Sequence, residues 1–292
     1  MIYTIKNSKL TVKIDDLGAE LSSILGLDGT EYLWQGDPTY WKGRAYNLFP
    51  IVGRLPNGKY LYEGEVYHML HHGFVRNSVL QAISLSQSEV EFVLRENEQT
   101  SKEYPFKFEY RIKYSLDENR LNIDVQVINT GEKDLIFAVG GHPGFNVPIG
   151  GAGKFEDYYL EFDAKARPKK ISLSPLGLTT DKVENFALEQ GNRLFLRHDL
   201  FDNDAICLKD MGQAVTIKSD NARRAIKVTY PQMRYLGVWH APQKPAPYIC
   251  IEPWSSMPSM DGVTEDLTTK LDMEKLPPEG KYSNIYSIEI IE

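Results

Sequence analysis

One histidine of the sequence lies between residues that restrict the backbone. His142 is in the stretch GGHPGFNVP, residues 140–148. The glycines let a ligand approach the backbone closely, and Pro143 disfavours a helical conformation at His142. The preceding DLIFAVG (134–140) is typical of a buried strand, so we expect His142 at a strand end in extended backbone. This arrangement suits an acid–base catalyst, and it equally suits a tight turn with a hydrogen-bonded histidine.

A glutamate interrupts an apolar strand nearer the end of the sequence. Glu252 stands between Ile251 and Pro253 in YICIEPW (248–254). A carboxylate is costly to bury unless it is paired or hydrogen-bonded, and burial raises its pKa toward that of a general base working near neutrality. We favour a catalytic role for Glu252. The alternative is an exposed glutamate on an edge strand, which Pro253 would permit.

Further candidates come from two loops rich in polar residues. Arg54 ends the apolar part of LFPIVGRLPNG (48–58), and its planar fork of donors suits hydroxyls or anions; the alternative is a surface salt bridge. FDNDAICLK (201–209) offers Asp204, with Asp202 as a competitor. Asp and Asn are also ordinary turn residues. Arg54 and Asp204 are therefore candidate substrate contacts, each with an ordinary structural alternative.

The histidine-rich stretch HMLHHGFVRN (68–77) has the i, i+3, i+4 spacing of a helical metal site. However, residues 60–69 are typical of a hairpin with its turn at Glu63-Gly64, and His68 and His71 would point to opposite faces of a strand. This argues against a three-histidine metal site. His72 is the better candidate for a pocket, and the alternative is a hydrogen-bonded core histidine.

No motif for a bound cofactor or metal accompanies these residues. The sequence has no phosphate-binding loop, no nucleotide-binding glycine pattern and no zinc spacing, so we expect no cofactor and no metal. Tryptophans could stack on the apolar faces of sugar rings, although such residues are more often in the core. They are Trp34, Trp41, Trp239 and Trp254.

Short β-rich segments separated by turns must position these side chains. Strands are predicted at 10–15, 90–96, 106–116, 120–129, 213–219, 225–230, 248–254 and 282–291, with hairpin turns at 117–119 and 220–221. The best helical pattern, at 183–196, is weak. Because nothing alternates strand and helix, we predict an all-β fold, a large antiparallel β-sandwich, as one domain over residues 1–292.

Composition narrows the class of protein. The chain has 292 residues and a net charge of −7, which argues against a nucleic-acid partner. Two cysteines, Cys207 and Cys250, do not form a disulfide framework and fit a reducing compartment. No apolar run is long enough for a membrane span and the N-terminal residues lack a signal-peptide core. We therefore expect a cytoplasmic protein without membrane contact.

Taken in order, five stretches resemble the aldose 1-epimerase (mutarotase) family. They are WQGDPTYWKGR (34–44), FPIVGR (49–54), HHGFVR (71–76), GGHPGFNVP (140–148) and YICIEPW (248–254). The resemblance extends from residue 31 to about residue 262. It implies a galactose mutarotase-like supersandwich whose concave face binds one sugar.

The resemblance also implies roles for the candidate residues. Glu252 matches the general base and His142 the general acid, while His72 matches a second histidine near the ring oxygen. Arg54 and Asp204 match residues that bind sugar hydroxyls. The sequence departs from the family at 53–59, GRLPNGK, where Gly58-Lys59 replaces a second arginine.

The implied reaction interconverts the α and β anomers of an aldose by ring opening and closure. It needs an ionised Glu252 and a protonated His142 at the same pH. The alternatives are a glycoside hydrolase that uses Glu252 and Asp204, and a carbohydrate-binding module without catalysis. The small-molecule sugar could be a free or a phosphorylated aldose, because Arg44, Arg54 and Arg76 fall near the predicted site. The residues leave a monomer or a homodimer open.

Overall fold

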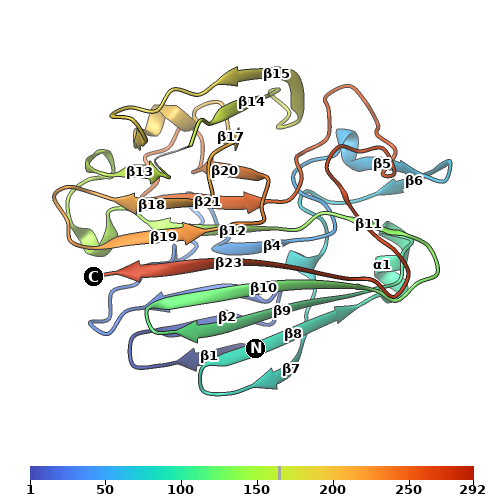
Figure 1. The fold of residues 1–292 in the computed structure, drawn as a ribbon, viewed down its shortest axis with the longest axis horizontal. Coiled ribbons are helices and arrows are strands. Elements are labelled where there is room, and N and C mark those ends of the chain that lie inside the picture. Colours follow the sequence, from blue (N-terminus) through green and yellow to red (C-terminus); the bar gives the residue numbers. More distant parts are fainter. Residues whose placement is uncertain (164–165) are drawn as a thin grey trace.

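Strands dominate the computed structural model, which describes residues 1–163 and 166–292 (Figure 1). The largest sheet has nine strands, in the order β16 (Arg193–Phe195), β13 (Tyr159–Phe162), β18 (Ala214–Lys218), β19 (Ala225–Thr229), β23 (Lys281–Ile291), β10 (Arg120–Asn129), β9 (Phe108–Asp117), β8 (Glu89–Arg95) and β7 (Gln81–Leu85). A second sheet has seven, in the order β15 (Thr179–Asn185), β14 (Lys169–Leu173), β17 (Ile206–Lys209), β20 (Tyr235–Trp239), β21 (Tyr248–Trp254), β12 (Gly140–Asn146) and β4 (Ala45–Leu48).

Smaller elements surround these two sheets. A three-stranded sheet contains β1 (Ile2–Lys6), β2 (Thr11–Asp15) and β3 (Glu20–Leu25), and two hairpin-sized sheets pair β5 (Lys59–Tyr62) with β6 (Glu65–His68) and β11 (Leu135–Phe137) with β22 (Glu274–Leu276). Helix α1 (Glu98–Glu103) is the α-helix of the described residues. Short 3₁₀ turns are η1 (Pro56–Gly58), η2 (Val75–Asn77), η3 (Ile149–Gly151), η4 (Phe155–Asp157) and η5 (His198–Phe201).

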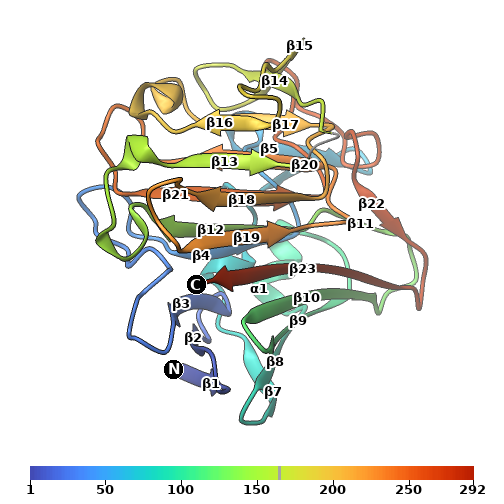
Figure 2. The same ribbon diagram turned by 60° about the vertical axis from the view of Figure 1, so that its left-hand side comes forward.

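The two large sheets lie face to face, with β12 and β21 behind β18 and β19 in Figure 2. Ile249 and Ile251 of the seven-stranded sheet share one buried core with Ile112 and Ile288 of the nine-stranded sheet. Because side chains alternate along a strand, this inward set leaves the intervening residues of β21 on the other face of the seven-stranded sheet. The predicted all-β antiparallel sandwich is confirmed.

Locally encoded turns agree with the sequence. β9 and β10 pair from Asp117 and Arg120 onward, and β5 and β6 pair around Glu63-Gly64. Both turns use positive φ values, at Glu118 and at Glu63 and Gly64, which is the backbone twist that joins two strands tightly.

The weak helical pattern at 183–196 does not correspond to a helix in the structure. Residues up to Asn185 belong to β15, which pairs with β14, and Arg193–Phe195 form β16, which pairs with β13. Leu194 is buried, and Phe186 and Leu188 pack against the same core, so the apolar residues of this segment reach the core without a helix. Pairing with distant strands therefore outweighs the local preference.

The buried strand predicted before His142 is divided in two. Leu135–Phe137 form β11, and β12 begins at Gly140, so His142 lies within a strand and not at its end. Its extended backbone agrees with the effect expected of Pro143. Among the described residues, no helix is long and apolar enough to cross a membrane.

Candidate functional site

The register between β12 and β21 places His142 opposite Glu252. Gly140 pairs with Trp254 and Gly144 with Cys250, so the residue midway along β12 faces the residue midway along β21. Both strands are central in the seven-stranded sheet, which excludes the edge-strand alternative for Glu252. Because Ile251 and Pro253 alternate with Glu252, its side chain projects from the face opposite the sandwich core.

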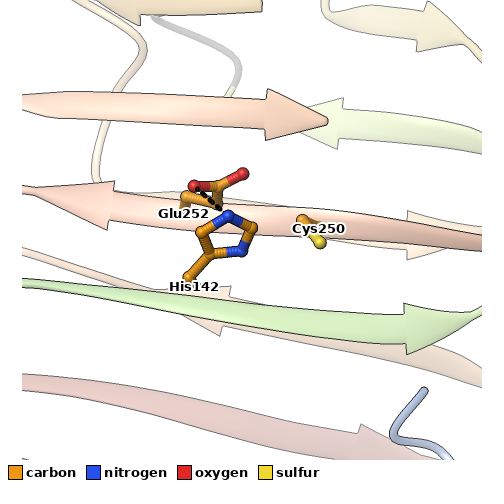
Figure 3. A group of neighbouring side chains, drawn as sticks. All are labelled: His142, Cys250 and Glu252. Carbon is orange, nitrogen blue, oxygen red and sulfur yellow. Dashed lines mark ion pairs between the residues drawn. The ribbon is translucent and has the colours of Figure 1, made fainter. Parts of the chain in front are cut away.

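The two side chains are in direct contact (Figure 3). His142 Nε2 lies 3.2 Å from Glu252 Oε2, and the side chains are 10% and 1% exposed. His142 Nδ1 and Glu252 Oε1 are buried and have no hydrogen-bond partner in the described part of the chain. Buried polar atoms are rarely left unpaired. These two atoms are therefore available to form hydrogen bonds with a ligand.

Burial sets the protonation of the pair. It raises the pKa of Glu252 well above its usual range, and the charge of Asp204 adds to this; burial also lowers the pKa of His142 to about 3. The unliganded site thus favours a protonated carboxyl beside a neutral imidazole. The reaction expected from the sequence needs the proton on His142 and an ionised Glu252, an arrangement that differs from this one in the position of a single proton.

A cavity of about 230 Å³ opens above this pair. All five predicted site residues line it: Arg54, His72, His142, Asp204 and Glu252. Further lining residues are Trp41, Tyr46, Gly53, His71, Arg76, Leu173, Gly177, Ala205, Trp239, Trp254 and Pro258. Asp202, the competitor of Asp204, is exposed and is absent from the lining. The structure therefore brings together residues from eight separate stretches of sequence.

His72 is fixed by a double hydrogen bond to Gly53. The Gly53 N–H donates to His72 Nδ1 at 3.0 Å, and the His72 N–H donates to the Gly53 carbonyl at 2.9 Å. Because burial lowers the pKa of His72 and Nδ1 accepts, its proton is on Nε2. His72 has a φ of +66°, an uncommon conformation for a side chain of this size. The strained backbone holds an Nε2–H donor at the cavity.

Arg54 and Asp204 approach each other across Gly177. A Cβ at Gly177 would be 3.0 Å from Arg54 Nε and 3.2 Å from Asp204 Oδ2. Asp204 has a φ of +78° and accepts the Ala205 N–H through Oδ1 at 2.9 Å. Its other oxygen is free for the cavity, so donor and acceptor groups lie side by side where sugar hydroxyls could bind.

Aromatic rings form the walls around His142. Trp41 stacks on the imidazole with centroids 4.9 Å apart, and Trp239 meets it edge to face at 5.7 Å. Trp254 also lines the cavity. Trp34, considered with them from the sequence, instead stacks on Tyr248 outside the lining. Aromatic faces of this kind suit the apolar faces of sugar rings.

Several residues that line the cavity were not predicted as site residues from the sequence. His71 was set aside on the assumption that it lay on a strand, but it lies in the turn after β6 and stacks on His72 at 3.8 Å. Tyr46 pairs with His142 across β4 and β12. The only signal for His71 was its place beside His72. Arg44, expected near the site, does not line the cavity.

Cys250 adds a third donor beside the acid–base pair. The ligand atoms of His142, Cys250 and Glu252 lie within 4.8 Å of one another (Figure 3), because residues 250 and 252 share one face of β21. Burial raises the pKa of Cys250 well above its usual range, so without a ligand Cys250 is a neutral thiol beside the acid–base pair.

Comparison with known proteins identifies the family and the fold. The model of the family Aldose 1-epimerase matches residues 1–263. The protein LacX of Lactococcus lactis is 33% identical over the whole of both chains. A galactose mutarotase related enzyme from Lactobacillus acidophilus has a TM-score of 0.95 at 34% identity, with 100% of this chain and 98% of that one covered.

A galactose mutarotase-like protein from Lactobacillus casei has a TM-score of 0.94 at 30% identity, with 99% of this chain and 100% of that one covered. The family resemblance inferred from five stretches of sequence is therefore confirmed, and the chain has the galactose mutarotase-like architecture. This chain belongs to the aldose 1-epimerase family.

Proposed function

We propose that the protein is an aldose 1-epimerase, which interconverts the α and β anomers of an aldose by general acid–base catalysis. The observation that carries the proposal is the contact of His142 Nε2 with Glu252 Oε2 at 3.2 Å beside the cavity. The anomeric hydroxyl and the ring oxygen are bonded to the same carbon. An acid and a base that touch each other can therefore reach both oxygens of one sugar.

The chemistry divides between the two groups. Glu252 removes the proton of the anomeric hydroxyl while His142 donates a proton to the ring oxygen, and the ring opens to the aldehyde. Rotation about the C1–C2 bond presents the other face of the aldehyde. Closure with the roles reversed gives the other anomer. Each positioned acid or base contributes about 10²–10⁴-fold to such a step.

One proton serves the pair through the whole cycle. Before ring opening it is on His142, and after ring opening it is on Glu252, so the pair never exchanges a proton with solvent. The unliganded site, with its raised Glu252 pKa and lowered His142 pKa, resembles the pair after ring opening. A bound cyclic sugar must move the proton to His142, and hydroxyl groups that donate to the Glu252 carboxylate favour that transfer.

The remaining residues would position the sugar. The Nε2–H of His72 is a donor for the ring oxygen region, and its tautomer is set by Gly53. Arg54 donates to oxygen atoms of the substrate and Asp204 accepts from its hydroxyls, and both line the cavity. Holding the sugar in one orientation lowers the entropic part of the barrier.

The test is exchange NMR and polarimetry of freshly dissolved α-anomers with wild type, Glu252→Gln and His142→Asn. We expect each variant to lose about 10²–10⁴-fold in rate. Matched controls are Glu63→Gln and His68→Asn, which make the same chemical changes at exposed residues outside the cavity. A rate near wild type in either site variant would refute the assignment.

The two alternative functions considered from the sequence would give different experimental results. A hydrolase that uses Glu252 and Asp204 would release nitrophenol from nitrophenyl glycosides. A carbohydrate-binding module would bind aldoses in calorimetry without accelerating anomer exchange. The direct contact of Glu252 with an imidazole supports the epimerase, because neither alternative needs that histidine.

A further inference from the structure

Two arginines without ion-pair partners face the candidate site. Arg54 follows β4, Arg76 is in η2, and both line the cavity. Within residues 1–163 and 166–292, no carboxylate oxygen lies within 4.0 Å of either guanidinium, whereas Arg111, Arg193 and Arg224 each make such a pair. Arg44 and Arg223 likewise make no ion pair among the described residues, but neither of them lines the cavity.

Arg76 is the more confined of the two. Its guanidinium carbon lies 4.8 Å from the ring centroid of Tyr46, and its Nε is buried without a hydrogen-bond partner in the described chain. Burial lowers the pKa of Arg76, and the charge of Arg54 lowers it further, against the opposing effects of Tyr46 and Glu20. A partly buried cation without a hydrogen-bonded anion is costly, so Arg76 has a charge that a ligand could neutralise.

The charges of both guanidiniums affect the pKa of His71. It lines the same cavity, and burial followed by the charges of Arg54 and Arg76 lowers its pKa to about 3. Arg54 and Arg76 thus give this part of the cavity its positive charge, and His71 is neutral beside them. An anion bound there would remove the repulsion between the two arginines and give His71 a partner.

The nearby carboxylates accept hydrogen bonds from backbone N–H groups, although the charge of Glu20 partly offsets that of Arg76. Asp204 directs Oδ1 to the Ala205 N–H, and Glu20 accepts the N–H groups of Arg44 and Ala45 through Oε1 at 2.7 and 2.8 Å. Neither carboxylate makes an ion pair with Arg54 or Arg76 within the described residues. The His142–Glu252 pair shares one proton and adds no net charge.

We propose that the substrate is an aldose with a phosphate group, and that Arg54 and Arg76 bind this phosphate beside His71. The proposal rests on the proposed epimerase function. A phosphate monoester has close to two negative charges and three terminal oxygens, which matches two guanidiniums better than the two oxygens of a sugar carboxylate do. The phosphate must be away from the anomeric carbon, since ring opening requires a free anomeric hydroxyl.

Exchange NMR with a matched set of sugars tests this. Glucose 6-phosphate and galactose 6-phosphate are compared with glucose, galactose and glucuronate, using wild type, Arg76→Gln and the control Arg223→Gln. Arg223 is exposed and absent from the cavity lining. We expect wild type to prefer a phosphorylated aldose by at least about 10-fold in kcat/KM, and Arg76→Gln to lower that preference by about 10- to 100-fold. Arg223→Gln should retain it.

The outcomes separate this inference from the function on which it rests. Rapid exchange of neutral aldoses with no preference for phosphorylated ones overturns the inference alone, and so does a preference for glucuronate over both phosphates. An unchanged preference in Arg76→Gln overturns it as well. If no aldose is exchanged, the epimerase function fails. Calorimetry with glucose 6-phosphate and glucose then decides the phosphate site, which requires tighter binding of the phosphate that Arg76→Gln weakens.

Discussion

Glu252 combines full burial with a contact to one imidazole, and that combination has a thermodynamic consequence. Its pKa in the folded protein is raised by burial, whereas an unfolded chain has a pKa of about 4.3. Between these two values the folded state binds more protons than the unfolded state, so the contribution of Glu252 to stability falls as pH rises. A functional carboxylate therefore destabilises the fold at neutral pH.

We predict that Glu252→Gln loses most of its activity but is more stable than wild type at neutral pH. Gln has the same shape and never ionises, so the gain in the free energy of unfolding should be near zero at pH 4 and increase toward pH 8. Urea denaturation at both pH values measures it, with Glu63→Gln as the exposed control. A gain that is equal at the two pH values would contradict the burial argument.

The pH dependence of activity should reflect the pair and not two separate groups. The state with one shared proton extends from the lowered pKa of His142, about 3, to the raised pKa of Glu252. We expect the enzyme-catalysed exchange rate between pH 6 and pH 8 to lack the fall that a separate histidine would produce. An isolated histidine with a pKa of about 6.5 would instead lose about 20- to 30-fold over that range. Rates corrected for the uncatalysed reaction in each buffer distinguish the two cases.

At the scale of elements, the loop after β4 and the turn after β6 depend on each other through Gly53 and His72. Gly53 has a φ of +74°, and a Cβ there would overlap the ring of Pro258. Pro258 lies in the loop that follows β21. One glycine thus lets three chain segments meet and places Arg54 and His72 at the cavity.

Gly53→Ala should therefore damage both stability and sugar exchange. Gly64→Ala is the matched control, because Gly64 has a φ of +83° but no atom within 4 Å of the added Cβ. We expect Gly64→Ala to cost about 1–2 kcal/mol through backbone strain alone and to leave exchange unchanged. Gly53→Ala should cost clearly more in chemical denaturation and lower kcat/KM, since Pro258 must move. Equal effects of the two substitutions would contradict this account.

What the sequence predicted at this scale was local. Alternating residues around 117–119 and 63–64 identify hairpins because the turn and its flanking strands are adjacent in the chain. The break between β11 and β12 was missed, because it depends on which distant strand each half pairs with, β22 or β21. Residues 183–196 were misjudged for the same reason.

The site residues also differ in how far the sequence could predict them. Glu252 was predictable because a charge inside an apolar strand is conspicuous in the sequence, and its likeness to a known family added His142. Their exact opposition was not predictable, because it follows from the register of β12 on β21. His71 and Tyr46 reach the cavity from a turn and from β4, and neither has a local pattern that reveals its neighbours.

At the scale of the whole molecule, the nine-stranded sheet supports the site from behind. Tyr286 of β23 is buried, and a Cβ at Gly141 would overlap its hydroxyl. Gly141 immediately precedes His142 on β12. Since β23 lies between β19 and β10, Tyr286 connects the centre of one sheet to the strand that positions the general acid in the other.

Tyr286→Ala should therefore reduce stability and then activity. Removing a buried aromatic side chain typically costs about 3–5 kcal/mol, because the cavity it leaves closes only in part. The matched control is Leu85→Ala on β7 of the same sheet, where the side chain is 59% exposed and the expected change is within about 0.5 kcal/mol. Urea denaturation measures both, and exchange NMR under conditions where each variant is fully folded measures the effect on the site.

If Tyr286→Ala were as stable as Leu85→Ala, packing between the sheets could not be what holds His142 against Glu252. If it were destabilised but exchanged sugar at the wild-type rate, the register of β12 on β21 would be sufficient without support from β23.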